Sequence, residues 1–267
     1  MHLALLHDGH PVLLRVEGPA GAPLALFFHP FPLHADAWND MLLACGAAGL
    51  RAAALDAPGF GGTPPLAGPL TMDFMADLGA AALDSLGAKR AGIVGCSMGG
   101  YQAIAFARRH PRRMAAAALI ATRAGADSDE AKKNRERQAQ LALEKGAAPV
   151  LAEFVPKLLS PDAAPAVRQR VDELAARATP RGIAGALRGM ALRPDSTGDL
   201  PGWTVPTLVI AGERDLLIPR AEMEKLAQGI PGARMEVIAG AGHLPFLENP
   251  AAVAPLLVAH LQVRLRT

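Results

Sequence analysis

The sequence predicts an α/β fold with a mostly parallel sheet, and two observations lead to this prediction. Short runs rich in leucine, valine or alanine alternate with longer alanine-rich stretches of helical pattern along most of the chain. This alternation is typical of strands and helices that wind through a parallel sheet. The chain has 267 residues, of which 51% are hydrophobic and 19% charged, so it is long and apolar enough to bury a large core.

The elements of this fold follow one another in a simple order. The first two apolar runs are separated by Asp8-Gly9, a pair that favours a hairpin turn. Thr71 stands at the start of a helical pattern, where a threonine side chain caps free backbone N–H groups. Eight strands are predicted, at residues 2–7, 11–16, 23–29, 50–56, 90–95, 114–122, 205–212 and 233–238. The helices predicted between and after them span residues 37–48, 71–86, 98–109, 220–229 and 250–264.

The alternation is interrupted in the second half of the chain. Between residues 123 and 201 there is no convincing strand, and helical patterns run near 129–145, 147–159, 164–178 and 180–192. A structureless loop of this length is uncommon in a compact domain. The sequence therefore predicts a core domain in two segments, 1–122 and 202–267, with a helical cap inserted at 123–201.

Charge and composition exclude several classes of protein. The formal net charge is only +2, and the densest basic patch, at residues 132–138, also contains an acid, so we expect a solvated helix face and no nucleic-acid partner. The longest uncharged stretch, residues 91–107, contains four glycines, which argues against a membrane helix. Cys45 and Cys96 show no metal or disulfide spacing, and the N-terminus does not resemble a secretory signal. We expect a reduced, cytoplasmic setting.

Ser97 is the strongest candidate for a chemical role. It stands in Gly95-Cys96-Ser97-Met98-Gly99, a G-x-S-x-G motif between a predicted strand and a predicted helix. A sharp turn at this point strains the serine backbone and leaves no room for side chains two residues before and after it. The turn holds the hydroxyl at the carboxyl edge of the sheet, beside the free N–H groups of a helix N-terminus. We interpret Ser97 as a nucleophile.

A serine nucleophile needs a base, and His243 is the best placed of the eight histidines. It follows the last predicted strand and precedes the last helix, so it lies on a loop at the same edge as Ser97. His29 and His34 are also expected near that edge. The order of the elements favours His243.

The base in turn needs an acid that orients it and stabilises its charged form. Asp215 comes just after the strand predicted at 205–212 and before a helix, again at the carboxyl edge. Glu213 is the alternative. The order Ser97, Asp215, His243 is the one that α/β-hydrolases use.

Five segments of the sequence resemble the α/β-hydrolase superfamily: "HPFPL", "DAPGFGGT", "GCSMGG", "GERDLLIP" and "GAGHLPFLENP". Taken together they are similar to small carboxylesterases and to 3-oxoadipate enol-lactonase-like hydrolases. The resemblance implies that the helical insertion is a cap placed after the sixth strand. It also implies an oxyanion hole formed by the backbone N–H groups of Phe31 and Met98, and a reaction that needs no metal or organic cofactor.

The substrate pocket is harder to predict. Trp38 is expected near the active edge, and Phe154 and Leu158, four residues apart on a predicted cap helix, can roof the site. For Trp38 and Phe154, ordinary core packing is the alternative. Arg123 follows the sixth strand, and it can pair with a substrate carboxylate or tie the cap to the core by a salt bridge.

The sequence thus predicts a serine hydrolase that cleaves small carboxylic esters or lactones. Enol-lactone hydrolysis and the reactions of perhydrolase- or haloperoxidase-type relatives use the same triad and remain alternatives. A non-catalytic protein of this fold that binds a small ligand is the alternative of another class, but such proteins usually lose a triad member. No metal is expected, and the oligomeric state does not follow from the sequence.

Overall fold

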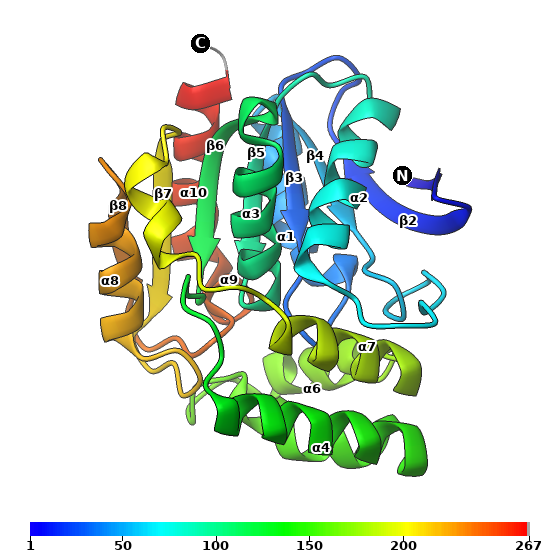
Figure 1. Ribbon diagram of the computed structural model, residues 1–267. Helices are drawn as coiled ribbons and strands as arrows, with labels where there is room; N and C mark the ends of the chain where they lie inside the picture. Colours follow the sequence, from blue (N-terminus) through cyan, green and yellow to red (C-terminus); the bar gives the residue numbers. More distant parts are fainter. Residues whose placement is uncertain (266–267) are drawn as a thin grey trace.

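The computed structural model describes residues 1–265, and its centre is one eight-stranded sheet (Figure 1). The strand order is β1-β2-β4-β3-β5-β6-β7-β8, in which β2 pairs antiparallel with β1 and β4 and all other pairs are parallel. The strands are β1 (His2–His7), β2 (His10–Glu17), β3 (Leu24–Phe28), β4 (Arg51–Leu55), β5 (Ala91–Cys96), β6 (Met114–Ile120), β7 (Thr207–Gly212) and β8 (Arg234–Ile238). The predicted mostly parallel sheet of eight strands is confirmed.

Helices cover both faces of this sheet. Helix α1 packs against α10 on one face, and α2 packs against α3 on the other, in front of the sheet in Figure 1. The α-helices are α1 (Asn39–Ala47), α2 (Met72–Ser85), α3 (Met98–Arg109), α4 (Asp129–Lys145), α5 (Ala147–Phe154), α6 (Pro165–Ala175), α7 (Pro180–Ala191), α8 (Arg220–Gly229), α9 (Pro245–Glu248) and α10 (Pro250–Leu265). Four short 3₁₀ helices complete the list: η1 (Ala35–Trp38), η2 (Pro111–Arg113), η3 (Val155–Lys157) and η4 (Thr197–Gly202). Among the described residues, no helix is long and apolar enough to span a membrane.

The central strands are apolar on both faces because both faces are covered. Every residue of β3 and of β5 is buried, as expected for parallel strands between two helical layers. At the antiparallel end, Asp8 and Gly9 both have positive φ, of 49° and 76°. This is the conformation of the tight turn that joins twisted hairpin strands, so the predicted hairpin between β1 and β2 is confirmed.

The strand order creates a natural binding site. Strand β3 lies between β4 and β5, and the chain leaves β3 toward α1 on one face but leaves β5 toward α3 on the other. In open α/β sheets, ligands bind at the carboxyl ends of strands where the direction of winding changes in this way. The loops that follow β3 and β5 carry Phe31 and Ser97.

Helices α4, α6 and α7 lie beyond the arrowheads of the strands, over the carboxyl ends of the sheet (Figure 1). Two features here differ from the prediction. The helix predicted at 147–159 ends at Phe154 and continues as the 3₁₀ helix η3, where Pro156 cannot donate an α-helical hydrogen bond. The short helices η4 and α9 were not predicted, because turns of four to six residues carry no periodic signal.

Candidate active site

Ser97 occupies a sharp turn between β5 and α3. Its backbone has φ 52° and ψ −115°, a conformation that non-glycine residues rarely adopt and that occurs mainly at functional sites. A Cβ atom at Gly95 would meet the Gly99 carbonyl oxygen at 2.1 Å, and one at Gly99 would meet the Phe28 carbonyl oxygen at 2.0 Å. Only glycine fits at these positions, so both glycines of the motif serve to let the strand, the turn and the helix approach one another closely.

Hydrogen bonds to the neighbouring strand hold the strained turn. The Ser97 N–H donates to the Ile120 carbonyl at 2.9 Å, and the Thr122 hydroxyl donates to the Ser97 carbonyl at 2.9 Å. Both partners lie at the carboxyl end of β6 or just after it. The surrounding structure therefore fixes the serine backbone, as a strained residue requires.

His243 and Asp215 form a buried hydrogen-bonded pair. The imidazole Nδ1–H donates to the Asp215 carboxylate, with distances of 2.8 Å to Oδ2 and 3.0 Å to Oδ1. The Asp215 Oδ1 atom also accepts from the backbone N–H groups of Leu217 and Ile218, which orients the carboxylate. The other ring nitrogen of His243, Nε2, is buried and has no hydrogen-bond partner among the described residues. With the proton on Nδ1, the neutral ring has an unprotonated Nε2 that can accept a proton, as a general base must.

Ser97 and His243 line the same cavity, which has a volume of about 120 Å³. The alternative acid, Glu213, lies elsewhere: its carboxylate accepts from the Gly240 N–H at 2.8 Å and holds the loop that precedes His243. The full cavity wall consists of Phe31, Ser97, Tyr101, Arg123, Arg135, Phe154, Met190, Leu217, Ile218 and His243. The structure thus brings together the predicted nucleophile and base, with the predicted acid behind the base.

The two backbone amides predicted to form an oxyanion hole have no hydrogen-bond acceptor among the described residues, and of the two residues only Phe31 is among those that line the cavity. Neither the Phe31 N–H nor the Met98 N–H donates a hydrogen bond to any residue that the structure describes. Met98 is the first residue of α3, so its N–H points out of a helix N-terminus, where the helix dipole favours negative charge.

The loop that carries Phe31 is held by His29, one of the other histidines expected near this edge, and by Asp56. His29 donates from Nδ1 to the Pro30 carbonyl and accepts at Nε2 from the Ala57 N–H, both at 3.0 Å. Burial lowers the pKa of His29 to about 4, so this ring stays neutral and structural. The Asp56 carboxylate accepts from the Ala35 and Gly62 N–H groups.

His34, the other candidate base, is a helix cap. Its Nδ1 accepts a long hydrogen bond from the Asp36 N–H, and burial lowers its pKa. His34 is not among the residues that line the catalytic cavity.

The predicted pocket residues separate into two groups. Phe154 lines the cavity and packs edge-to-face on Phe31, with ring centroids 5.1 Å apart. Trp38 and Leu158 do not line it. Trp38 is fully buried and stacks on Phe246 at 3.9 Å, so it belongs to the core. Leu158 is also fully buried, and the chain changes from α-helix to 3₁₀ helix between Phe154 and Leu158. The four-residue spacing therefore no longer places the two side chains on one helical face.

Arg123 lines the cavity and pairs with Asp127, with 2.8 Å between Nη2 and Oδ1. Arg135 and Arg193 bind the same carboxylate. Sequence reasoning named only Arg123 of these four residues. The i, i+4 spacing of Arg123 and Asp127 was a usable signal, but the other two partners come from separate helical segments.

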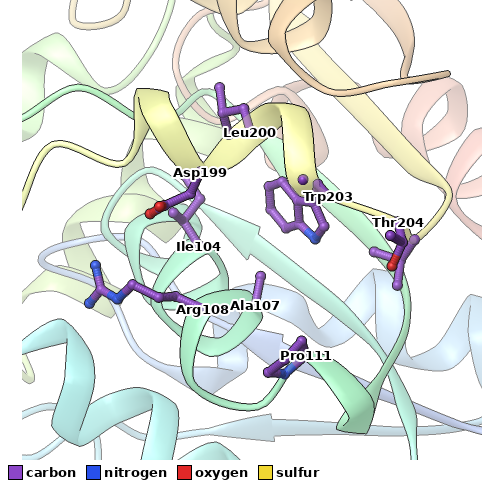
Figure 2. A pocket seen from close by; sticks show the side chains of 10 residues that line it. Ile104, Ala107, Arg108, Pro111, Asp199, Leu200, Trp203 and Thr204 are labelled. Atoms are coloured by element: carbon purple, nitrogen blue, oxygen red, sulfur yellow. The ribbon is translucent and has the colours of Figure 1, made fainter.

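A second, larger pocket of about 270 Å³ lies at the opposite end of α3 (Figure 2). Figure 2 shows the indole of Trp203, which follows η4, together with Asp199 of η4 and Arg108 of α3. None of Ser97, Asp215 and His243 lines this pocket, and Arg108 is already paired with Asp73. The residues predicted to be catalytic therefore favour the smaller cavity as the candidate site. Within residues 1–265, no group of three or more His, Cys, Asp or Glu side chains is arranged to hold a metal ion.

Glu248, in α9, links the loop of His243 to the helical insertion. Its Oε1 accepts from the Gly242 N–H at 2.8 Å, and its Oε2 accepts from the Ser160 N–H at 2.9 Å. A Cβ atom at Gly242 would lie 2.4 Å from the Ser160 nitrogen, so the two backbones touch directly. One carboxylate thus fixes Gly242, the residue before His243, against Ser160.

Replacing Glu248 with glutamine is expected to lower kcat about 10-fold or more, with a smaller effect on KM. The amide NH₂ cannot accept a hydrogen bond, so one of the two contacts is lost, and small displacements of a catalytic group are costly. Steady-state kinetics on a neutral ester measure this effect. Glu224→Gln on α8 is the matched control, since Glu224 pairs only with the exposed Arg220. An unchanged kcat in Glu248→Gln would contradict the positioning role.

Comparison with known proteins identifies the family to which this fold belongs. Residues 23–250 match the family model described as alpha/beta hydrolase fold. The pimeloyl-[acyl-carrier protein] methyl ester esterase of Neisseria meningitidis serogroup A is 32% identical over 210 residues, a match that covers 76% of this chain and 65% of the relative.

Two solved structures are similar over nearly their whole length. A thermophilic esterase from Thermogutta terrifontis, solved with malate bound, is 34% identical with a TM-score of 0.93, covering 99% of both chains. The enol-lactonase from Burkholderia xenovorans LB400 is 26% identical with a TM-score of 0.90, covering 97% of this chain and 100% of the other. The predicted resemblance is confirmed, and the chain belongs to the α/β-hydrolase fold family.

Proposed function

We propose that this protein is a serine hydrolase that cleaves small carboxylic esters through an acyl-enzyme. The observation that carries the proposal is the pair His243–Asp215, whose unpartnered Nε2 shares a cavity of about 120 Å³ with a serine held in a strained turn. The relatives that support it are esterases at 32% and 34% identity. Residues 123–201 form the cap over this site in the same proposal.

The first half of the reaction forms the acyl-enzyme. His243 Nε2 takes the proton of the Ser97 hydroxyl as Oγ attacks the ester carbonyl, and the resulting oxyanion accepts hydrogen bonds from the N–H groups of Phe31 and Met98. Asp215 stabilises the imidazolium that forms. The C–O bond to the alcohol then breaks, and the alcohol leaves with the proton from His243. Loss of one oxyanion donor generally costs about 10²- to 10³-fold in rate.

The second half regenerates the serine. His243 takes a proton from water, which attacks the acyl carbonyl, and the same two N–H groups hold the second oxyanion. Collapse of this intermediate releases the carboxylic acid and returns the proton to Ser97. The same residues can open a lactone ring, and the enol-lactonase at 26% identity makes lactones the second substrate class to test.

A chain-length series of p-nitrophenyl esters, run beside a panel of neutral lactones, tests the proposal. We expect acetate and butyrate esters to be hydrolysed faster than octanoate, because a cavity of about 120 Å³ holds only a short acyl group. Absence of turnover for every ester and lactone, by protein whose circular dichroism shows it folded, would contradict the proposal.

A further inference from the structure

Three arginines share one buried carboxylate at the end of the catalytic cavity. The Asp127 side chain is 0% exposed, and its Oδ1 accepts at 2.8 Å from Nη2 of Arg123 and at 2.8 Å from Nη2 of Arg193. Arg135 donates from Nε to the other oxygen, Oδ2. Burial alone would raise the pKa of Asp127, but the hydrogen bonds from Arg193 and Arg135 bring it well below its usual range. The carboxylate is therefore ionised at neutral pH.

The cluster carries an excess of positive charge at the cavity wall. Three guanidinium groups face one carboxylate, and two of them, Arg123 and Arg135, line the cavity together with Ser97 and His243. Among the described residues that line the cavity, none is Asp or Glu. Glu222 acts on Arg123 from α8, but it is itself paired with Lys225.

Burying charge without full compensation is costly, and here two donors of the cluster have no partner among the described residues, one on Arg123 and one on Arg193. The Arg123 Nε–H is buried and has no hydrogen-bond partner within residues 1–265. Arg123, unlike Arg193, also lines the cavity that contains Ser97 and is not fully buried, so its remaining donors can meet an acceptor that arrives with the substrate.

A purely structural role explains Arg193 better than the other two arginines. Arg193 is 4% exposed, lies 4.0 Å from the centre of the Tyr101 ring, and donates to the Gly125 and Met190 carbonyls as well as to Asp127. It fixes the carboxylate without lining the cavity. Asp127 in turn holds Arg123 and Arg135 in place. The side chains of these two arginines are partly exposed, Arg123 to 28% and Arg135 to 18%.

We propose that this cluster binds a carboxylate on the substrate, so that the preferred substrates are short esters that also carry a free carboxylate. The inference rests on the proposed ester hydrolysis and names its substrate class. Arg123 and Arg135 supply the donors, since guanidinium groups match a carboxylate in geometry and charge. The cavity volume of about 120 Å³ limits the spacer to a few carbons. With monoethyl succinate, water cleaves the ester bond to give succinate, ethanol and one released proton.

Two substrates that differ in one group test this proposal on the unaltered protein. Monoethyl succinate carries the carboxylate, and ethyl levulinate has a methyl ketone of nearly the same shape in its place. We expect a higher kcat/KM for monoethyl succinate, roughly 10- to 100-fold, the range for hydrogen bonds to charged groups. Succinate is expected to inhibit levulinate hydrolysis competitively. Equal kcat/KM values without inhibition by succinate would overturn the proposal.

Two single-residue variants test whether Arg123 and Arg135 bind the substrate carboxylate. Arg123→Gln and Arg135→Gln are each expected to lower kcat/KM for monoethyl succinate roughly 10- to 100-fold, mainly through KM, and to lower kcat/KM for ethyl levulinate by a smaller factor. Arg137→Gln is the matched control, because Arg137 lies on the same helix as Arg135 but pairs with Glu153 at the surface, 54% exposed. O-acetylglycolate, with its carboxylate on the alcohol side, shows on which side of the ester the arginines act. Equal losses for charged and neutral esters would contradict the assignment.

Failure of this inference can be told from failure of the proposed function. If ethyl levulinate is hydrolysed but the carboxylate brings no advantage, the esterase activity stands and the carboxylate site is wrong. If no ester of either kind is hydrolysed, the proposed function itself is wrong.

Discussion

Replacing Ser97 with alanine is expected to lower kcat/KM for ester substrates by roughly 10⁴- to 10⁶-fold, the range for loss of a triad nucleophile. Alanine differs only by the hydroxyl oxygen, so the strained turn with φ 52° is kept and the fold should be unchanged. Kinetics on p-nitrophenyl acetate measure the loss of activity. The midpoint of urea denaturation shows whether the variant remains as stable as the unaltered protein.

Ser85→Ala is the matched control for this variant. Ser85 is exposed at the end of α2, and its hydroxyl donates only to the Ala82 carbonyl. We expect this variant to retain full activity. Hydrolysis by Ser97→Ala at a tenth of the wild-type rate or faster would show that another group is the nucleophile.

Replacing Asp127 with alanine is expected to lower the free energy of unfolding by about 3–5 kcal/mol, the usual cost of breaking a buried ion pair. The substitution leaves the guanidinium groups of Arg123, Arg135 and Arg193 close together with no carboxylate between them. Urea denaturation at neutral pH measures the change.

Asp129→Ala is the control, since Asp129 lies in the first turn of α4 with its side chain 94% exposed. Its loss should cost less than about 1 kcal/mol, the size of a favourable helix-dipole interaction. Equal effects for the two variants would show that the arginines are individually solvated and form no cluster.

The fold was predictable because its signals are local. Apolar runs of strand length, alanine-rich helical stretches and Asp8-Gly9 each determine structure within a few residues. The Ser97 motif is equally local, since the clashes that require Gly95 and Gly99 arise within a single turn. The positions of Asp215 and His243 followed from one rule, that loops after parallel strands meet at one edge of the sheet.

The remaining features depend on packing between distant segments. Asp127 meets Arg193 across 66 residues of sequence and Glu248 meets Ser160 across 88, and no periodic pattern reports such contacts. Leu158 was placed on the roof of the cavity because the helix was taken to continue past Phe154. A 3₁₀ turn follows instead, and Leu158 is buried in the core.

Covalent labelling with a fluorophosphonate tests most directly whether Ser97 is an activated nucleophile beside His243. We expect one adduct per chain, found by mass spectrometry on the peptide that contains Ser97, and no adduct after His243→Ala, because the base is then missing. An active, folded protein that carries no adduct on Ser97, or carries it on another residue, would contradict the catalytic triad.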